Sequence, residues 1–144
     1  VTAVDDLSAW LTQIWDEQEK VARVALQHDD GDDENRPFLR HAVDYLGSEL
    51  ADHIILNDPD SVLARSAADR RILADYRKVL RQQEENSDEF ALLMRQPVED
   101  YERLNQVKTF GWQVQGRVEA LSAVVRLLAS PHADRPGYQE AWRP

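Results

Sequence analysis

The sequence predicts an all-α protein, a compact helical bundle built on one long C-terminal helix. The 144 residues contain only five glycines and six prolines, which favours helices over a turn-rich β architecture. Between residues 98 and 129, apolar residues recur at alternating steps of three and four, which places them in one seam along a helix. The seam consists of Leu104, Val107, Gly111, Val114, Val118, Leu121, Val125 and Leu128. A seam of this length requires other segments to cover it.

Composition narrows the class of protein. A chain of this length is typical of a single domain, 1–144, with a core of its own. The absence of cysteine excludes a disulfide scaffold and thiolate metal sites, and it suits a reducing cytoplasm. No apolar run approaches the roughly 18 residues of a membrane span, so we expect no membrane partner. The net charge of −10 argues against a nucleic-acid partner.

The first predicted helix covers about residues 4–27. Its apolar positions keep the three-four spacing, and two tryptophans, Trp10 and Trp15, flank them. The apolar positions are Leu7, Leu11, Ile14, Val21 and Ala25, interrupted by Gln18.

The segment 28–37 is predicted to be an acidic loop. Five acidic residues surround Gly31, but their spacing does not match the alternating oxygen ligands of an EF-hand calcium loop. The following segment, 38–47, fits either a helix or a short hairpin that ends at Gly47. Ser48 then suits the cap of a short helix to about Leu56.

The clearest helix-start signal in the sequence lies at Asp58 and Pro59, which suit the N-cap and the first position of a helix. This helix is predicted to reach about Gln83, with a turn at 84–87 and a further short helix before Pro97. Asp69 falls on its apolar face, where a buried carboxylate would need a partner.

The same helix carries a group of cations that we call the basic stripe. Six basic and two acidic residues lie between positions 64 and 81, whereas the rest of the chain is strongly acidic. A phosphate, an acidic partner or acidic groups of the same chain could each satisfy the stripe, as could water. Its members are Arg70, Arg71, Arg77, Lys78 and Arg81.

The chain closes with a segment rich in proline and aromatic residues, 131–144, which is predicted to fold back as a clasp. Pro131 ends the long helix, and Tyr138 and Trp142 are four residues apart, so they can share one face of a short helical turn. Trp112 lies off the seam, so a second surface is expected to cover it.

Three stretches of the sequence are distinctive: the closing segment 126–144, the central motif 52–59 with its continuation to Leu73, and the opening from Asp5 to Glu17. Together they resemble a small actinobacterial and actinophage family, known as domain of unknown function six-two-two-one. The chain departs from the family pattern at Asn57, where a histidine is usual, and at Asp69, where a basic residue is usual. The resemblance implies a bacterial or phage-infected cytoplasm, and it supplies no activity or cofactor.

The sequence offers little support for an enzyme. No two of the four histidines have the spacing of a helical zinc site, and no phosphate loop or nucleophile elbow is present. His53 and Asp58 are the weak candidates for a metal site, and Asp58 is explained by capping alone. Scattered carboxylates leave a glycosidase-type pair open, because their spacing is not specific. We therefore expect no cofactor.

These observations predict a non-catalytic module that binds another protein, either a second copy of itself or a host protein. One alternative is a phage-encoded acidic modulator that blocks a host protein, and another is a metal- or nucleotide-handling enzyme. The residues predicted to contact a partner are the five cations of the basic stripe together with Trp112 and Trp142, since aromatic residues are enriched at interfaces.

Overall fold

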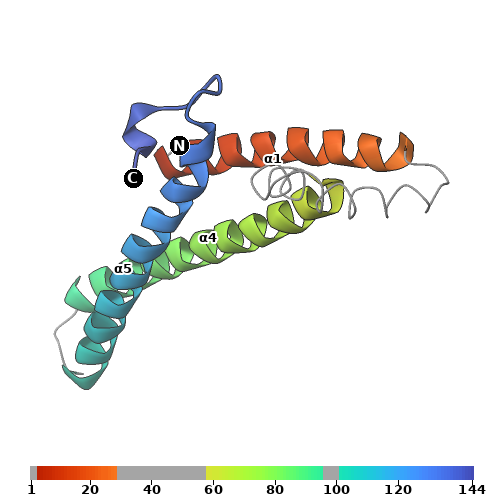
Figure 1. The fold of residues 1–144 in the computed structure, drawn as a ribbon. Helices are drawn as coiled ribbons and strands as arrows, with labels where there is room; N and C mark the ends of the chain where they lie inside the picture. Colours follow the sequence, from red (N-terminus) through yellow and green to blue (C-terminus); the bar gives the residue numbers. More distant parts are fainter. Residues whose placement is uncertain (1–2, 29–57, 96–100) are drawn as a thin grey trace, which may run out of the picture. The chain divides into compact units, whose positions relative to one another are not determined.

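The computed structural model describes residues 3–28, 58–95 and 101–144, and these confirm the all-α prediction (Figure 1). They form three long helices and two short 3₁₀ helices, with no strand among them. The alternative hairpin at 38–47, the short helix at 48–56 and the acidic segment from residue 29 onward lie outside the described residues. The bounds are α1 Ala3–His28, α4 Pro59–Arg95, α5 Tyr101–Ala129, η1 Ser130–His132 and η2 Glu140–Trp142.

The chain divides into two compact units, Val1–Arg70 and Arg71–Pro144, and the boundary falls within α4. The first unit contains α1 and the start of α4. The second contains the rest of α4, α5 and the C-terminal tail. The organisation as one domain stays a prediction, and each unit is described by itself.

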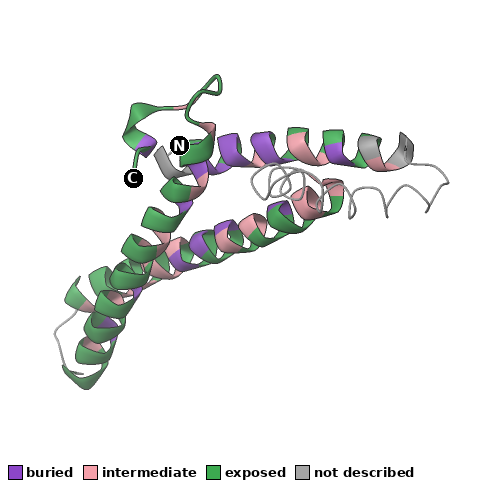
Figure 2. Ribbon diagram, viewed as in Figure 1, coloured by how far each residue is buried: buried purple, intermediate pink, exposed green. Residues whose placement is uncertain are grey.

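In the first unit, α1 buries Leu7, Leu11 and Ile14 of the predicted apolar stripe together with both flanking tryptophans (Figure 2), and the side chain of Ala25 lies outside the described residues. One position was predicted wrongly, because Val21 is 71% exposed and Ala22 is buried in its place. Positions 21 and 22 lie 100° apart around the helix, so the buried side of α1 is rotated in its later turns relative to its first turns. The buried apolar residues of α1 are Leu7, Trp10, Leu11, Ile14, Trp15 and Ala22.

The start of α4 has the predicted cap. The backbone N–H of Ser61 donates to a carboxylate oxygen of Asp58 at 3.2 Å, and the N–H of Val62 donates to the Asp58 carbonyl at 2.9 Å. Pro59 occupies the first helical position, where its missing N–H costs nothing. Asp69, which was predicted to lie within the apolar face, is half-buried and has an interaction partner.

The predicted turn at 84–87 is wrong, because α4 runs without a break from Pro59 to Arg95, a length of 37 residues. The segment is polar, but it contains no glycine or proline, and glutamate is a good helix former. Asn86 lies within the helix and directs its amide toward Gly111 of α5. Contact with α5 therefore keeps helical a segment whose polarity alone suggested an end.

The seam on α5 is confirmed, since each of its eight residues is buried or half-buried. The first half of α5 runs antiparallel to the last turns of α4. Gln83 donates to Gln115, and Arg103 donates to Glu89 with its Nε at 2.9 Å. At Gly111, an added β-carbon would lie 2.7 Å from the Asn86 amide nitrogen, so the two helices approach closely there.

The tail begins with Pro131 inside η1, directly after α5. Gly137 has a φ of 87°, a conformation that favours glycine, and it turns the chain toward η2. The rings of Tyr138 and Trp142 meet edge to face, with centroids 5.8 Å apart. Only Trp142 belongs to η2, so the predicted ring contact forms without a shared helical turn.

Replacing the helix cap Asp58 should lower the free energy of unfolding. Asp58→Ala removes the acceptor for the Ser61 N–H and should cost about 1 kcal/mol of unfolding free energy, measured by urea denaturation. Asp58→Asn keeps an acceptor oxygen and should stay close to wild type. Equal losses in both variants would show that the charge of Asp58, rather than the cap, is what matters.

The two glycines of α5 should respond differently to alanine. Gly116 has open space around its α-carbon, so Gly116→Ala should stabilise the protein by about 0.5–1 kcal/mol through helix propensity. Gly111→Ala should fall short of that gain by roughly 1 kcal/mol, because the new methyl group meets the Asn86 amide. The difference should shrink when Asn86→Ala is added. Equal gains in urea unfolding would contradict the close approach.

Candidate functional site

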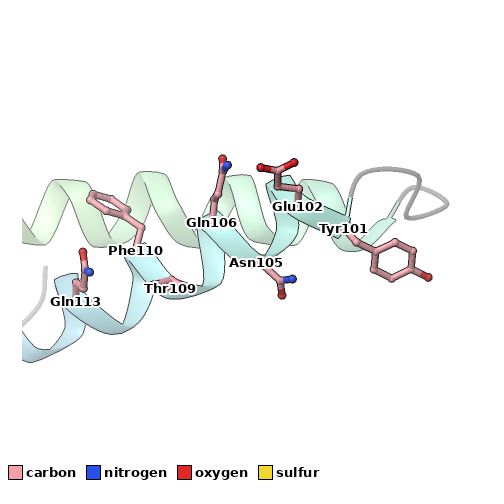
Figure 3. A pocket seen from close by; sticks show the side chains of 7 residues that line it. All are labelled: Tyr101, Glu102, Asn105, Gln106, Thr109, Phe110 and Gln113. Atoms are coloured by element: carbon pink, nitrogen blue, oxygen red, sulfur yellow. The ribbon is translucent and has the colours of Figure 1, made fainter.

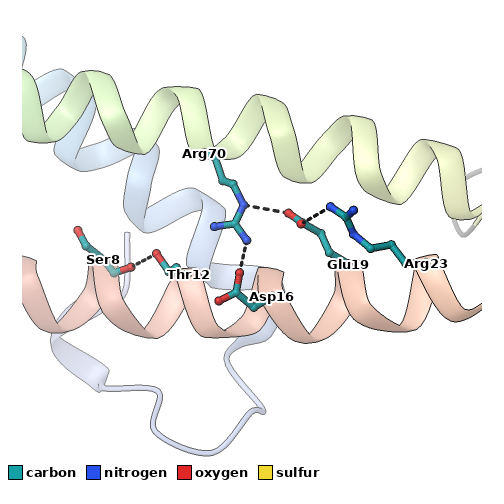
Figure 4. A network of polar contacts seen from close by, with 6 residues as sticks. All are labelled: Ser8, Thr12, Asp16, Glu19, Arg23 and Arg70. Atoms are coloured by element: carbon teal, nitrogen blue, oxygen red, sulfur yellow. Dashed lines mark hydrogen bonds and ion pairs between the residues drawn. The ribbon is translucent and has the colours of Figure 1, made fainter.

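Arg70, the first member of the basic stripe, is bound by acidic groups of its own unit. Its Nε donates to Glu19 at 2.9 Å and a terminal nitrogen donates to Asp16 at 2.5 Å (Figure 4). Its guanidinium carbon also lies 5.8 Å from the centre of the Trp15 ring, which is fully buried. Acidic groups of the same chain, Glu19 and Asp16, therefore neutralise the charge of Arg70.

This network shifts the protonation equilibria of its members toward their charged forms. The hydrogen bond from Arg70 lowers the pKa of Glu19, an effect that burial partly opposes. The same hydrogen bond raises the pKa of Arg70. A general acid needs a pKa near the working pH, so a glutamate held in its ionised form does not suit that role. The shift therefore has a structural explanation.

The other members of the stripe, Arg71, Arg77, Lys78 and Arg81, are exposed along α4 in the second unit. Asp75 lies at a spacing of three or four from Arg71 and Lys78, and Glu84 and Glu85 lie at these spacings from Arg81, so opposite charges screen one another there. Arg77 has no acidic residue at either spacing. These four cations therefore have the arrangement of a solvated helix face. Their role as a partner site stays a prediction.

The first half of α5 presents a different kind of surface. Among residues 104–116 only Lys108 is charged, in a chain where 31% of residues carry charge. Trp112 is 68% exposed, and the Lys108 ammonium lies 5.2 Å from the centre of its ring. The expectation that a second surface covers Trp112 is wrong for the described residues, because the side chain points away from the seam that α5 buries.

A shallow hollow lies on the same stretch of α5 (Figure 3). All its lining residues come from this one helix and all are exposed, so the hollow is open to solvent. Sites for small molecules normally enclose most of the ligand surface. This surface is better suited to contact with another macromolecule. The lining residues are Tyr101, Glu102, Asn105, Gln106, Thr109, Phe110 and Gln113.

Trp142, predicted to contact a partner, is only 3% exposed. Its ring contacts Tyr138, and it belongs to the clasp that the sequence also predicted. The prediction that Trp142 contacts a partner is therefore wrong for this conformation, because its side chain has almost no accessible surface.

Of the two weak metal candidates, the structure describes only Asp58. Asp58 serves as a helix cap, and His53 lies outside the described residues. Within the described residues, no group of three histidine, aspartate or glutamate side chains could hold a metal ion. Nor does any described helix combine the length and apolar content needed to cross a bilayer.

A family model matches residues 4–144, nearly the whole chain. Its description is "Family of unknown function (DUF6221)". The chain belongs to this family. No curated protein and no solved structure matches it. The DUF6221 assignment confirms the resemblance found in three stretches and adds no activity, so function has to be argued from the surface of the molecule.

Sequence reasoning about this DUF6221 chain found Trp112 but missed Tyr101 and Phe110. Both are exposed, Tyr101 at 69% and Phe110 at 44%, on the same stretch of α5. The shortage of charge between positions 104 and 116 is visible in the sequence and could have indicated this surface.

The Arg70 network should contribute to stability in a pH-dependent way. Glu19→Gln removes the charged acceptor and should cost about 1–2 kcal/mol of unfolding free energy, because Glu19 is only 18% exposed. Asp16→Asn should cost less than about 0.5 kcal/mol, because Asp16 is 65% exposed and well screened.

Because the pKa of Glu19 is lower in the folded than in the unfolded state, its contribution is complete above the ordinary glutamate pKa of about 4.3. The contribution is lost as the pH falls further, through the lowered pKa. Urea unfolding of wild type and Glu19→Gln across pH 3–7 should show a difference that is constant near neutrality and shrinks at the acidic end. A difference independent of pH would contradict the ion pair.

Proposed function

We propose that this chain is a non-catalytic protein-interaction module that binds its partner through the first half of α5. The observation that carries the proposal is the exposed Trp112 within a stretch almost free of charge. Protein interfaces are depleted of charged residues at their centres and enriched in aromatic ones, and tryptophan is among the residue types enriched at energetic hot spots. Phe110 and Tyr101 are two further exposed aromatic residues on the same half of α5.

The polar side chains of this surface fit the same role. Asn105, Gln106 and Gln113 each carry an amide that can donate and accept hydrogen bonds, and desolvating an amide costs far less than desolvating a charge. A partner can therefore displace water from this surface at modest cost. Lys108 can remain over the Trp112 ring at the rim, where its ammonium stays hydrated.

A second candidate, the phage-encoded acidic modulator, is favoured by the distribution of charge. Residues 1–70 contain 16 acidic and 6 basic residues, whereas residues 71–144 contain 11 of each. The whole net charge of −10 therefore belongs to the first unit. A modulator of this kind would bind a basic site on a bacterial host protein through the first unit. No described cluster of residues favours the enzymatic alternative.

Loss of Trp112 should weaken partner binding without unfolding the protein. Proteins captured from a bacterial lysate by the immobilised chain provide the ligand for titration with Trp112→Ala. We expect affinity to fall at least about tenfold, because hot-spot residues contribute roughly 2 kcal/mol or more. The melting temperature should change little, because the ring is exposed.

Val21→Ala is the matched control, since Val21 is as exposed as Trp112 but lies on α1. Equal affinity of Trp112→Ala and wild type would refute α5 as the contact surface. Binding that ignores Trp112 but weakens steeply with added salt would instead favour the acidic modulator, because screening shortens the range of charge interactions to about 10 Å at 0.1 M salt.

A further inference from the structure

A second row of residues runs along α5 on the side opposite the seam. Its members lie two positions after those of the seam and keep the same alternation of three and four. Every one is exposed, none is charged, and no described residue covers them. We call this set the outer row: Gln106, Thr109, Gln113, Gly116, Ala120, Ala123 and Leu127.

The neighbouring helix shows what an ordinary solvated face looks like in this unit. The outward positions of α4 between residues 71 and 88 are mostly charged and exposed. They include Arg71, Asp75, Lys78, Glu85 and Asp88. Residues 71–88 of α4 and the whole of α5 belong to the same compact unit, yet only the outer row of α5 is free of charge. The side of a surface helix opposite its buried stripe normally carries charged or polar residues, whereas the second half of the outer row carries glycine, alanine and leucine.

Large apolar side chains flank the outer row and extend the uncharged surface. Phe110, Trp112 and Val124 lie beside it, and Leu127 stands at its end with 56% exposure. Arg117 and Glu119 lie on the flanks of the row, and Glu102 stands before its first member, four positions ahead of Gln106. An uncharged centre with charges at its edges is the arrangement of a protein interface.

The charge distribution points to the occupant. The unit that carries α5 is neutral, so two copies of it can approach without net repulsion. The first unit carries the full charge of −10, so first units of two copies repel each other and favour an approach through the second units. Amide and hydroxyl groups, which both donate and accept hydrogen bonds, can pair with their own copies across a twofold axis.

We propose that a second copy of this chain covers the outer row, giving a symmetric dimer in which α5 contacts α5. The proposal rests on the proposed function and names the partner for the same helix. Most soluble oligomers are homo-oligomers, and the twofold dimer is the commonest. Each copy contributes the same uncharged row, while the flanking charges stay at the wet rim.

The test compares the mass in solution of the full chain and two matched variants by light scattering. Ala120→Glu places a charge in the middle of the outer row, and it should weaken the dimer at least about tenfold. Ala74→Glu makes the same change at an exposed position of α4 and should leave the dimer intact. Both positions are exposed, so both variants should melt near wild type. A wild type that stays monomeric, or a dimer that Ala120→Glu leaves intact, would overturn the proposal.

Because the chain has no cysteine, single-cysteine variants test the contact directly. Cysteine at Gln113, Gly116, Ala120 or Ala123 should give a disulfide-linked dimer under mild oxidation at the position nearest the twofold axis, and cysteine at Ala74 should not. No crosslink at any of the four positions would refute α5 pairing. A monomer whose lysate partner still depends on Trp112 would refute the dimer alone and leave the proposed function standing.

Discussion

At Gly111 the backbone of α5 lies so close to α4 that the Asn86 amide occupies the space a β-carbon would need. This approach fixes the rotation of the first half of α5 about its own axis. Seam residues on either side, such as Val107 and Val114, are then buried. Positions one or two residues away from the seam must point elsewhere, since successive residues are 100° apart. The exposure of Trp112 and of the outer row follows from the same constraint.

Electrostatics separate the two units. In the first unit the acidic excess is concentrated, and Arg70 is taken up by Glu19, Asp16 and the face of Trp15. In the second unit charges of both signs balance, and they are absent from the outward side of α5. An uncharged surface is cheap to dehydrate, and a neutral unit does not repel its own copies. The proposed contact surface therefore lies where association meets the least electrostatic resistance.

Family membership alone cannot assign a role, because DUF6221 is a family of unknown function. The surface of α5 is more informative. Its exposed aromatic and amide side chains make an interaction role the best supported, and its open form does not enclose a small substrate. Arg70 and Glu19 show that a shifted pKa in this chain reflects an ion pair that joins two helices.

The sequence by itself determined the helical class, the seam of α5, the start of α1 and the cap at Asp58. These features depend on residues within one or two helical turns of each other, so local spacing and capping chemistry were sufficient. The same local reasoning predicted a false break at 84–87, because polarity resembles a helix end when the partner helix is unknown. It also placed Val21 on the buried stripe, although the buried side of α1 is rotated in its later turns.

Only the tertiary structure decided which cation is neutralised and which aromatic ring is available. Arg70 and its acidic partners are 51 and 54 residues apart in sequence, so no local pattern could distinguish it from Arg77 or Arg81. The sequence predicted that both Trp112 and Trp142 contact a partner, yet Trp112 is exposed and Trp142 is buried. Burial is set by which distant segments meet, and that information is absent from the spacing of residues along one helix.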